Sequence, residues 1–326
     1  MRAPGFWWRS PDRPGLWPCL LAPMGWVYAA ATARRLRAAG YRASVPVICV
    51  GNLVAGGAGK TPTVIALIER LTARGHAVQV VSRGYGGRLE GPVRVTAEHS
   101  AEEVGDEPLL LSAFAPVWVA KDRAAGVRAA EAAGARVILL DDGFQSPSVV
   151  PALGLVVVDA AKGFGNGRCI PAGPLREPVA VGLARADLVL TIGDDVAQAQ
   201  FGAIWPVPVP RLRGRLEPLR MGMDWAGQRV LAFAGIADPS RFFATLRAEG
   251  ADLVRGEALA DHEMLSETLL RRLEAEAWAK GAQLVTTEKD AARLPLAWRP
   301  KVLTLVVRLR IEDWSPLDAE LDRLGL

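Results

Sequence analysis

Short apolar runs, each ending at a glycine-rich or acidic turn, recur through the first two thirds of the chain. Their length and β-branched content are typical of strands, and helical segments such as Thr63–Arg74 lie between them. This alternation predicts an α/β fold, a mostly parallel sheet with helices on both faces. The first expected strand begins at Val45. The others are expected at Val78–Val81, Pro116–Ala120, Val137–Leu140, Leu155–Asp159 and Asp187–Thr191.

The alternation of apolar strands and helical segments is interrupted by a proline-rich stretch and resumes after it. Prolines at positions 206, 208, 210 and 218 favour a connector over a regular element. A smaller C-terminal α/β unit follows, in which Glu288–Asp290 is expected to form a turn. Its expected elements are strands at Arg229–Ala234, Leu284–Thr287 and Val302–Val307, and helices within Leu265–Lys280. We therefore expect four parts, at residues 1–42, 43–205, 206–227 and 228–326.

The first 42 residues stand apart by their aromatic and basic content. Four of the ten tryptophans lie within the first 26 residues, and the apolar run Leu16–Ala33 is followed by Arg34, Arg35 and Arg37. This combination is typical of a helix that lies at a membrane surface. The run contains two prolines and is shorter than the about 20 residues of a spanning helix, so we expect it to lie on the membrane. A helix docked on the protein's own core and a secretory signal peptide are the alternatives.

Composition excludes several classes of protein. Half of the 326 residues are apolar, which is enough for a large core and argues against disorder. The net charge of +4 is concentrated at the N-terminus, where the first 50 residues hold seven arginines and one aspartate, so the remaining chain sums to −2. Nucleic-acid binding would require basic and aromatic residues spread over the folded body. The three cysteines lack metal-ligand spacing, which indicates a reducing compartment and no zinc site.

The segment Val45–Thr61 joins an apolar strand to a glycine-rich turn that ends in Lys60 and Thr61. Its glycines let backbone N–H groups curl around phosphate oxygens, and the following helix adds its positive N-terminal end. In such a phosphate loop Lys60 contacts the β- and γ-phosphates and the Thr61 hydroxyl binds Mg²⁺. The motif has Val54 where glycine is usual, and an ordinary flexible turn is the alternative. The expected nucleotide-binding residues are Val54, Ala55, Gly56, Gly57, Ala58, Gly59, Lys60 and Thr61.

Two further segments place polar side chains where the carboxyl ends of the expected strands meet. Asp141 and Asp142 follow a buried strand, a position from which carboxylates hold Mg²⁺ beside a nucleotide; a solvated loop is the alternative. The loop Gly163–Pro178 is too rich in glycine and proline for regular structure. A loop of this length in a compact domain is usually functional, and it carries Arg176 and Glu177.

Three other residues have both a structural and a functional interpretation. Asp106 lies two residues before Pro108 at an expected helix start, where a capping carboxylate is the simpler interpretation. His262 stands beside carboxylates in a polar loop, where a surface or capping residue is the simpler interpretation. Arg83 belongs to the glycine-rich segment Ser82–Gly87, which is either a tight turn or a contact to phosphate or sugar.

The order of these motifs resembles that of one known family. Along the chain they are GNLVAGGAGKTP, SRGYGG, VGDEP, LLDDGFQ, PAGPLREP, AGIADPSRFF, DHE and TTEKDAARL. From Val45 to Leu294 the chain is thereby similar to the tetraacyldisaccharide 4'-kinases, the lipid A kinases of Gram-negative bacteria, which also lack the first glycine of the loop. The N-terminus resembles the membrane-associated segment of that family. Glu263 departs from the pattern, because the family often has a second histidine there.

The resemblance implies a phosphate-loop NTPase-like fold and a reaction in lipid A biosynthesis. The γ-phosphate of ATP would pass, with Mg²⁺, to the 4'-hydroxyl of a tetraacylated glucosamine disaccharide 1-phosphate. The reaction would take place at the cytoplasmic face of the inner membrane, on a peripheral or monotopic protein. The implied partners are the lipid substrate and the membrane surface, with neither nucleic acid nor an obligate protein partner.

The resemblance also implies roles for single residues. Lys60 and Thr61 would serve the phosphates and Mg²⁺. Asp141 and Asp142 would form the metal site, together with Glu177. Asp106 would be the base on the attacking hydroxyl, and His262 its partner.

Two functions of other classes compete with this interpretation. A switch NTPase that loads a partner or a metal has a similar topology, but the guanine-specific kind requires an NKxD-type strand end. In the segment Thr287–Asp290 the lysine is in the wrong register for that motif. A non-catalytic adaptor at the membrane surface would leave Asp106, Asp141 and His262 without a role.

Overall fold

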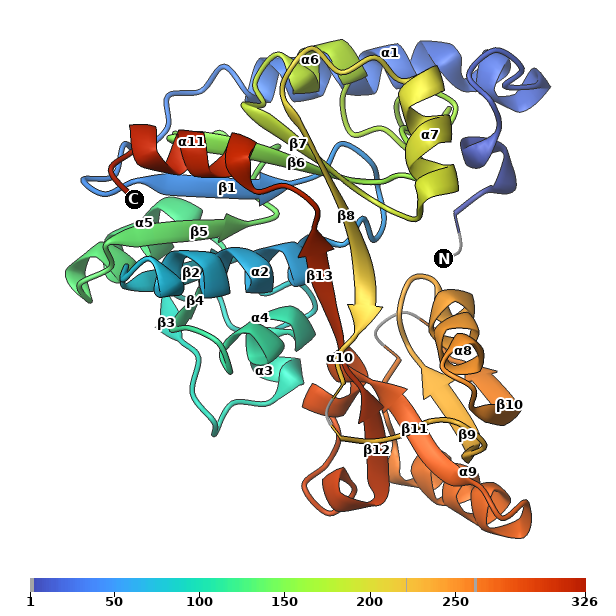
Figure 1. The fold of residues 1–326 in the computed structure, drawn as a ribbon. Helices are drawn as coiled ribbons and strands as arrows, with labels where there is room; N and C mark the ends of the chain where they lie inside the picture. Colours follow the sequence, from blue (N-terminus) through green and yellow to red (C-terminus); the bar gives the residue numbers. More distant parts are fainter. Residues whose placement is uncertain (1–2, 221, 261–262) are drawn as a thin grey trace.

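The computed structural model describes residues 3–220, 222–260 and 263–326, which form two α/β units of unequal size (Figure 1). Within these residues the larger sheet has nine strands, in the order β13-β8-β7-β6-β1-β5-β2-β4-β3. Neighbouring strands run parallel except at the two edges, where β13 pairs antiparallel with β8 and β3 with β4. The predicted mostly parallel α/β sheet is confirmed.

The central strand of this sheet is β1, which is buried throughout and lies between β5 and β6. The strands of the larger sheet are β1 (Val47–Gly51), β2 (Val78–Ser82), β3 (Val93–Arg94), β4 (Val117–Val119), β5 (Val137–Asp141), β6 (Leu153–Asp159), β7 (Leu188–Ile192), β8 (Arg211–Pro218) and β13 (Val307–Ile311).

Helices cover both faces of the larger sheet and enclose an apolar core on each side. Leu67 of α2 and Leu321 of α11 belong to one core, and Val127 of α5 and Phe201 of α7 belong to the other. The helices of this unit are α1 (Leu16–Arg35), α2 (Lys60–Ala73), α3 (Ala101–Val104), α4 (Asp106–Leu111), α5 (Arg123–Ala132), α6 (Val179–Leu183), α7 (Asp195–Ile204) and α11 (Ser315–Arg323), preceded by the 3₁₀ turn η1 (Gly5–Trp8).

The smaller unit repeats this design on a four-stranded parallel sheet, counted over the described residues, in the order β10-β9-β11-β12. Phe242 of α8 packs on one side of it and Leu270 of α9 on the other. Its elements are β9 (Arg229–Ala234), α8 (Pro239–Ala248), β10 (Asp252–Ala258), α9 (Glu267–Ala279), β11 (Gln283–Thr287), α10 (Glu288–Ala292), η2 (Arg299–Lys301) and β12 (Val302–Leu305).

The segments that join the two units differ from the prediction. Residues 206–227, expected as a connector, contain β8, and the strand expected at Val302–Val307 divides into β12 of the smaller sheet and β13 of the larger one. Figure 1 shows β8 and β13 side by side, extending toward the smaller unit. The end of the chain therefore returns to the larger unit.

The prediction of a turn at Glu288–Asp290 is also wrong, because these residues are the first three of helix α10. The domain boundaries themselves stay a prediction.

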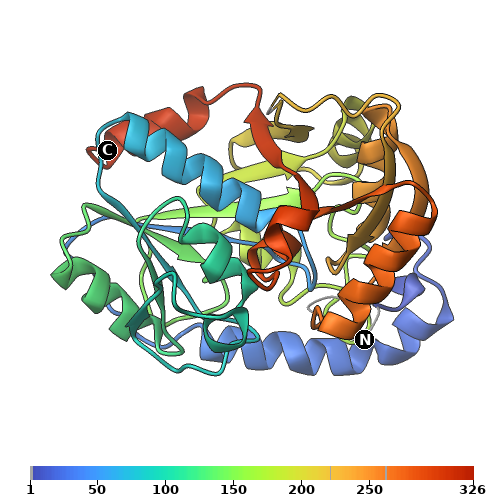
Figure 2. The ribbon, with the colours of Figure 1, turned by 90° about the horizontal axis from the view of Figure 1, so that it is seen from below.

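Helix α1 runs along one side of the larger unit (Figure 2). Its small residues face the body: Ala22, Gly25 and Thr32 are buried. Its opposite side is apolar and exposed, with Trp17 at 65% and Leu20 at 64% of full exposure. The helix has 20 residues, and an 18-residue window within it has a mean hydropathy of 1.2, so length and composition would also allow it to cross a membrane. It is thus docked on the protein and still presents an apolar surface.

Candidate active site

The phosphate loop connects the central strand β1 to α2. Gly59 is the N-cap of α2 with φ of 90°, and a Cβ there would lie 2.6 Å from Cδ1 of Ile192, so the position requires glycine. The helix begins three residues earlier than predicted, which places Lys60 and Thr61 in its first turn. The N–H groups of residues 56–59 donate to no backbone carbonyl of the described residues. Free N–H groups of this kind are typical of a phosphate-binding loop, and their contact with phosphate stays a prediction.

Residues 174–176 of the long loop run antiparallel to the start of the phosphate loop and hold it in place. The N–H of Ala55 donates to the carbonyl of Pro174 at 2.7 Å, and the N–H of Arg176 donates to the carbonyl of Leu53 at 2.8 Å. The Ala55 N–H is thus engaged within the protein. The loop expected to be functional acts here as a support for the phosphate-binding backbone.

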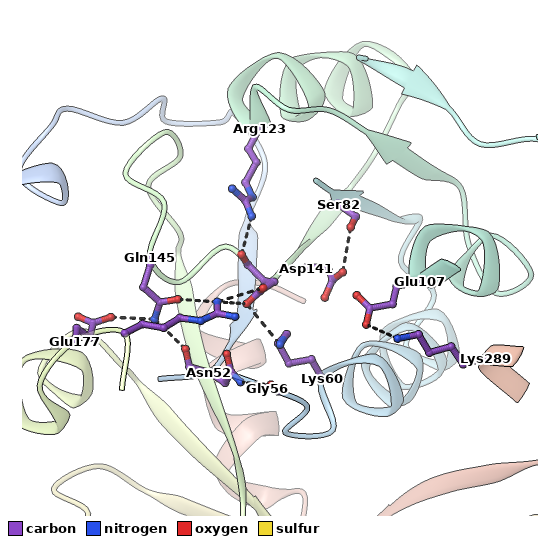
Figure 3. Close-up of polar contacts among 12 residues, drawn as sticks. Asn52, Gly56, Lys60, Ser82, Glu107, Arg123, Asp141, Gln145, Glu177 and Lys289 are labelled. Carbon is purple, nitrogen blue, oxygen red and sulfur yellow. Dashed lines mark hydrogen bonds and ion pairs between the residues drawn. The ribbon is translucent and has the colours of Figure 1, made fainter. Parts of the chain in front are cut away.

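Lys60 lies among charged groups at the carboxyl end of β5 (Figure 3). Its ammonium group is 3.6 Å from the Asp142 carboxylate, which also accepts hydrogen bonds from Arg176 at 3.1 and 3.3 Å. Burial alone would raise the pKa of Asp142, but Lys60 and Arg176 outweigh it and hold that pKa below its ordinary value. Asp142 has φ of 49°, a left-handed backbone that is rare for a residue with a side chain. The guanidinium of Arg123 donates to its carbonyl at 2.7 Å, which helps to fix this conformation.

Asp141 differs from its neighbour, because it points into the protein from the last position of β5. One carboxylate oxygen accepts a hydrogen bond from the Ser82 hydroxyl at 3.1 Å, and the other is buried without a partner among the described residues. Burial, with the nearby carboxylates of Glu107 and Asp142, raises its pKa to about 7, against the opposing charge of Lys60. A buried carboxylate oxygen without a partner is stabilised by a cation.

This donor set fits Mg²⁺. The ion keeps several waters and is usually bound by one or two carboxylates together with substrate phosphates, so Asp141, Asp142 and the Thr61 hydroxyl suffice beside a nucleotide. No group of three or more His, Cys, Asp or Glu side chains in the described ranges forms a metal site by itself. The site is thus suited to an ion that arrives with phosphate.

Glu177, the third expected metal ligand, lies in a separate network. Its side chain is 2% exposed and paired with Arg185 at 2.6 Å. Its other neighbour is Gln145, whose amide donates to Glu177 at 3.0 Å and to the carbonyl of Asn52 at 2.8 Å. The Asn52 side chain in turn donates to the carbonyl of Gly56 at 3.1 Å. Glu177 therefore supports the phosphate loop through two side chains, and its contact with a metal stays a prediction.

Asp106 begins α4, which packs against α2. The N-cap of this helix is Gly105, so the structural interpretation of Asp106 as a cap is wrong. Its carboxylate is buried, and Arg293 of the smaller unit lies 3.8 Å from it. Beside it, Lys289 of α10 lies 3.5 Å from Glu107 (Figure 3). The other expected member of this pair, His262, is outside the described residues.

A second contact between the units lies beside the phosphate loop. Asp159, at the end of β6, is paired with Arg241 of the smaller unit at 2.8 Å, and Lys162 is 3.1 Å from Asp238. A Cβ added to Gly57 would touch the Cβ of Ala237 at 3.4 Å, so the segment that leads into α8 lies against the phosphate loop. Neither ion pair was predicted. From the sequence alone a charged residue in a loop is interpreted as exposed to solvent, because a partner far away in the chain cannot be recognised.

A cavity of about 490 Å³ lies where α1 meets the long loop. Trp26, Ala29 and Trp205 contribute apolar surface to it, and Arg168 contributes a positive charge. The cavity is open to solvent beside the exposed apolar side of α1. A space with mixed apolar and polar lining and one cation matches an amphipathic ligand with a negative group.

Comparison with known proteins agrees with this geometry. The curated tetraacyldisaccharide 4'-kinase of Dinoroseobacter shibae is 62% identical over 99% of this chain and 98% of its own. That of a Jannaschia species is 56% identical over 99% of both chains. A crystal structure of LpxK from Aquifex aeolicus in complex with ATP superposes with a TM-score of 0.80 at 25% identity, covering 95% of this chain and 100% of that one.

The family described as tetraacyldisaccharide-1-P 4'-kinase matches residues 17–325, which extends beyond the segment that carried the resemblance. The resemblance inferred from the sequence motifs is thereby confirmed. With this match and relatives of more than half identical sequence, the chain belongs to the tetraacyldisaccharide-1-phosphate 4'-kinase family, LpxK.

Proposed function

We propose that this protein is an ATP-dependent kinase that phosphorylates the 4'-hydroxyl of a tetraacylated glucosamine disaccharide 1-phosphate in lipid A biosynthesis. The observation that carries the proposal is the position of Lys60, which lies at the start of α2 and 3.6 Å from Asp142. A helix N-terminus, a lysine and two strand-end carboxylates are the parts that a phosphoryl transfer requires on the nucleotide side.

On the nucleotide side the chain supplies charged and polar groups that bind and position the phosphates of ATP. The N–H groups of residues 56–59 bind phosphate oxygens, and Lys60 exchanges Asp142 for the β- and γ-phosphates when ATP enters. Thr61, Asp141 and Asp142 hold Mg²⁺, which neutralises developing charge on the phosphates when bound. The ion pair with Lys60 keeps Asp142 ionised and ready for the metal.

On the acceptor side Asp106 takes the proton of the attacking 4'-hydroxyl. Its carboxylate is buried beside the charges of the smaller unit, which limits the access of water to the reaction. We assign His262 as its partner, because the next residue, Glu263, accepts a hydrogen bond from Arg293. Loose phosphoryl transfer depends more on orientation than on basicity, so a well-oriented carboxylate is sufficient.

The lipid and membrane assignments are supported by α1. Its exposed apolar side and the cavity beside Arg168 offer surfaces for acyl chains and for a negative headgroup. An acylated disaccharide leaves the bilayer at a cost of about 0.8 kcal/mol for each methylene, so the enzyme must reach the membrane. We place the protein at the cytoplasmic face of the inner membrane of a Gram-negative cell. There it needs ATP, Mg²⁺ and the lipid, without nucleic acid or an obligate protein partner.

The test follows labelled γ-phosphate from Mg-ATP onto a tetraacylated disaccharide 1-phosphate in mixed micelles. Parent, Lys60→Ala and Asp106→Asn proteins are compared, with Arg271→Gln as control, since Arg271 forms an exposed ion pair with Glu267 on α9. We expect labelled lipid from the parent and the control, and a loss of about 10³-fold in both active-site variants. ATP hydrolysis without labelled lipid would contradict the proposal and indicate a switch NTPase.

A further inference from the structure

Arg293 follows α10 and is, among the described residues, one that faces Asp106 from the smaller unit. Its side chain is 6% exposed, and its Nη1 atom lies 3.8 Å from the Asp106 carboxylate, whose side chain is 9% exposed. A separation of 3.8 Å is an ion-pair distance rather than a hydrogen bond. Two oppositely charged groups that are buried together interact more strongly than an exposed pair, because water screens them less.

The guanidinium of Arg293 is fixed on its other sides. Its Nε donates to Asp290 at 3.2 Å, its Nη2 is paired with the same carboxylate, and its Nη1 donates to the carbonyl of Glu263 at 2.7 Å. Asp290 is fully buried and also accepts hydrogen bonds from the Gly235 N–H and the Thr287 hydroxyl. The planar group therefore has a defined direction before any substrate binds.

The absence of a side chain at Gly235 leaves room for the Arg293 guanidinium beside Asp290. A Cβ at this position would overlap the Nη2 atom of Arg293 and would lie 3.2 Å from the Asp290 carboxylate. Gly235 has no left-handed backbone that would require glycine. Its lack of a side chain is explained by the room that the guanidinium occupies.

We propose that Arg293 is a positioning residue, which holds the Asp106 carboxylate in the direction of the acceptor hydroxyl. This inference rests on the proposed role of Asp106 as the base. Asp290 balances the charge of Arg293, so the arginine orients Asp106 without adding a net positive charge to the acceptor side. The Lys289–Glu107 contact beside it fixes α10 against α4. Docking of the smaller unit and orientation of the base are then one event.

The competing explanation is that Arg293 only neutralises the buried Asp290. Loss of Arg293 alone would leave that carboxylate without a counter-charge and would destabilise the protein in either case. The double variant Asp290→Asn/Arg293→Gln removes both charges and so restores neutrality. It separates stability from positioning, because Asp106 still lacks its arginine.

The first test measures kcat, the KM for ATP and the midpoint of thermal unfolding for the parent, Arg293→Gln and the double variant, with Arg271→Gln as control. We expect kcat to fall about 10²-fold in both Arg293 variants, the effect of a misplaced reacting group. The KM for ATP should stay within about twofold, and the unfolding midpoint should recover in the double variant. Recovery of kcat together with the midpoint would overturn the inference.

The second test asks whether Arg293 acts through Asp106. In the Asp106→Asn protein, Arg293→Gln should lower kcat by less than about twofold, whereas independent effects would multiply and overturn the inference. Thermal unfolding is also measured for the parent, Asp106→Asn, Arg293→Gln and the protein that carries both substitutions. This measurement requires no kinase activity. Non-additive midpoint changes would support the Arg293–Asp106 contact even if the parent transferred no phosphate, and additive changes would overturn it. Failure of the proposed function is therefore distinguishable from failure of this inference.

Discussion

The phosphate loop is held on two sides by contacts of different kinds. Toward the long loop, its first half is fixed by backbone hydrogen bonds of 2.7 and 2.8 Å that involve Ala55 and Leu53. Toward the smaller unit, it meets Ala237, and the Asp159–Arg241 and Lys162–Asp238 ion pairs hold that contact. The first side belongs to the same unit as the loop, and the second side joins two units.

The two kinds of contact differ in what can break them. Backbone hydrogen bonds beside the buried strand β1 are shielded from solvent, so this side persists as long as the larger unit is folded. The ion pairs are partly exposed: 50% for the Arg241 side chain and 30% for that of Lys162. Such pairs are worth about 1 kcal/mol or less and weaken with salt. We infer that the first side sets ATP binding and the second sets closure over the acceptor.

The rigid side also connects the nucleotide site to α1. A Cβ at Gly25 would lie 3.0 Å from the carbonyl of Cys169, and the indole N–H of Trp7 donates to the carbonyl of Pro171 at 3.0 Å. The loop that supports the backbone of the phosphate loop is thus packed directly against α1. Truncation of the N-terminus would uncover this loop, so substitutions on the exposed side of α1 are the better probe.

Among three further substitutions, Asp141→Asn should produce the largest loss of kcat, and it acts on the rigid side. We expect kcat to fall about 10²-fold and the Mg²⁺ concentration for half-maximal rate to rise about tenfold, because a charged metal ligand is lost. The unfolding midpoint should not fall, since one oxygen of the carboxylate is buried without a partner in the described structure. Titration of activity with MgCl₂ makes the measurement, with Asp252→Asn as control at an exposed pair within the smaller unit. An unchanged Mg²⁺ requirement would contradict the assignment.

The double substitution Trp17→Ser/Leu20→Ser should weaken binding to anionic vesicles about 30-fold, because about 2 kcal/mol of apolar burial is lost. The affinity for ATP should not change, since both side chains face away from the long loop. Vesicle sedimentation provides the readout. Leu296→Ser is the matched control, with a leucine that is 78% exposed on the smaller unit. Full recovery of the double variant with vesicles would rule out α1 as the membrane surface.

Arg241→Ala should have the smallest effect, on the side that joins the units. We expect kcat to fall about fivefold. Added NaCl should lower the rate of the variant less than that of the parent, because salt weakens the Asp159–Arg241 ion pair and the variant no longer has it. Steady-state rates between low and moderate salt provide the measurement. Arg229→Ala is the control, since Arg229 pairs with Asp252 within the smaller unit. An equal loss in the control would show that closure is not involved.

The sequence was most informative where function depends on local backbone. The strand before the phosphate loop, the loop itself and the pair Asp141–Asp142 follow from short-range patterns, and the structure has β1, α2 and β5 there. The strand β8 was missed because its flanking prolines and alternating arginines favour a connector. Its place in the sheet depends on pairing with β7 and with β13, which is almost 100 residues away. Arg241, Arg293 and Gln145 were missed for the same reason, since their partners lie far away in sequence.

One pair of measurements tests the division between the two sides of the phosphate loop most directly. The dissociation constant of ATP and the single-turnover rate of γ-phosphate transfer are determined for the parent, Lys60→Ala and Arg241→Ala. We predict that Lys60→Ala weakens ATP binding and abolishes transfer, whereas Arg241→Ala slows transfer with an ATP dissociation constant within about twofold of the parent's. A loss of ATP affinity in Arg241→Ala as large as that in Lys60→Ala would contradict this division.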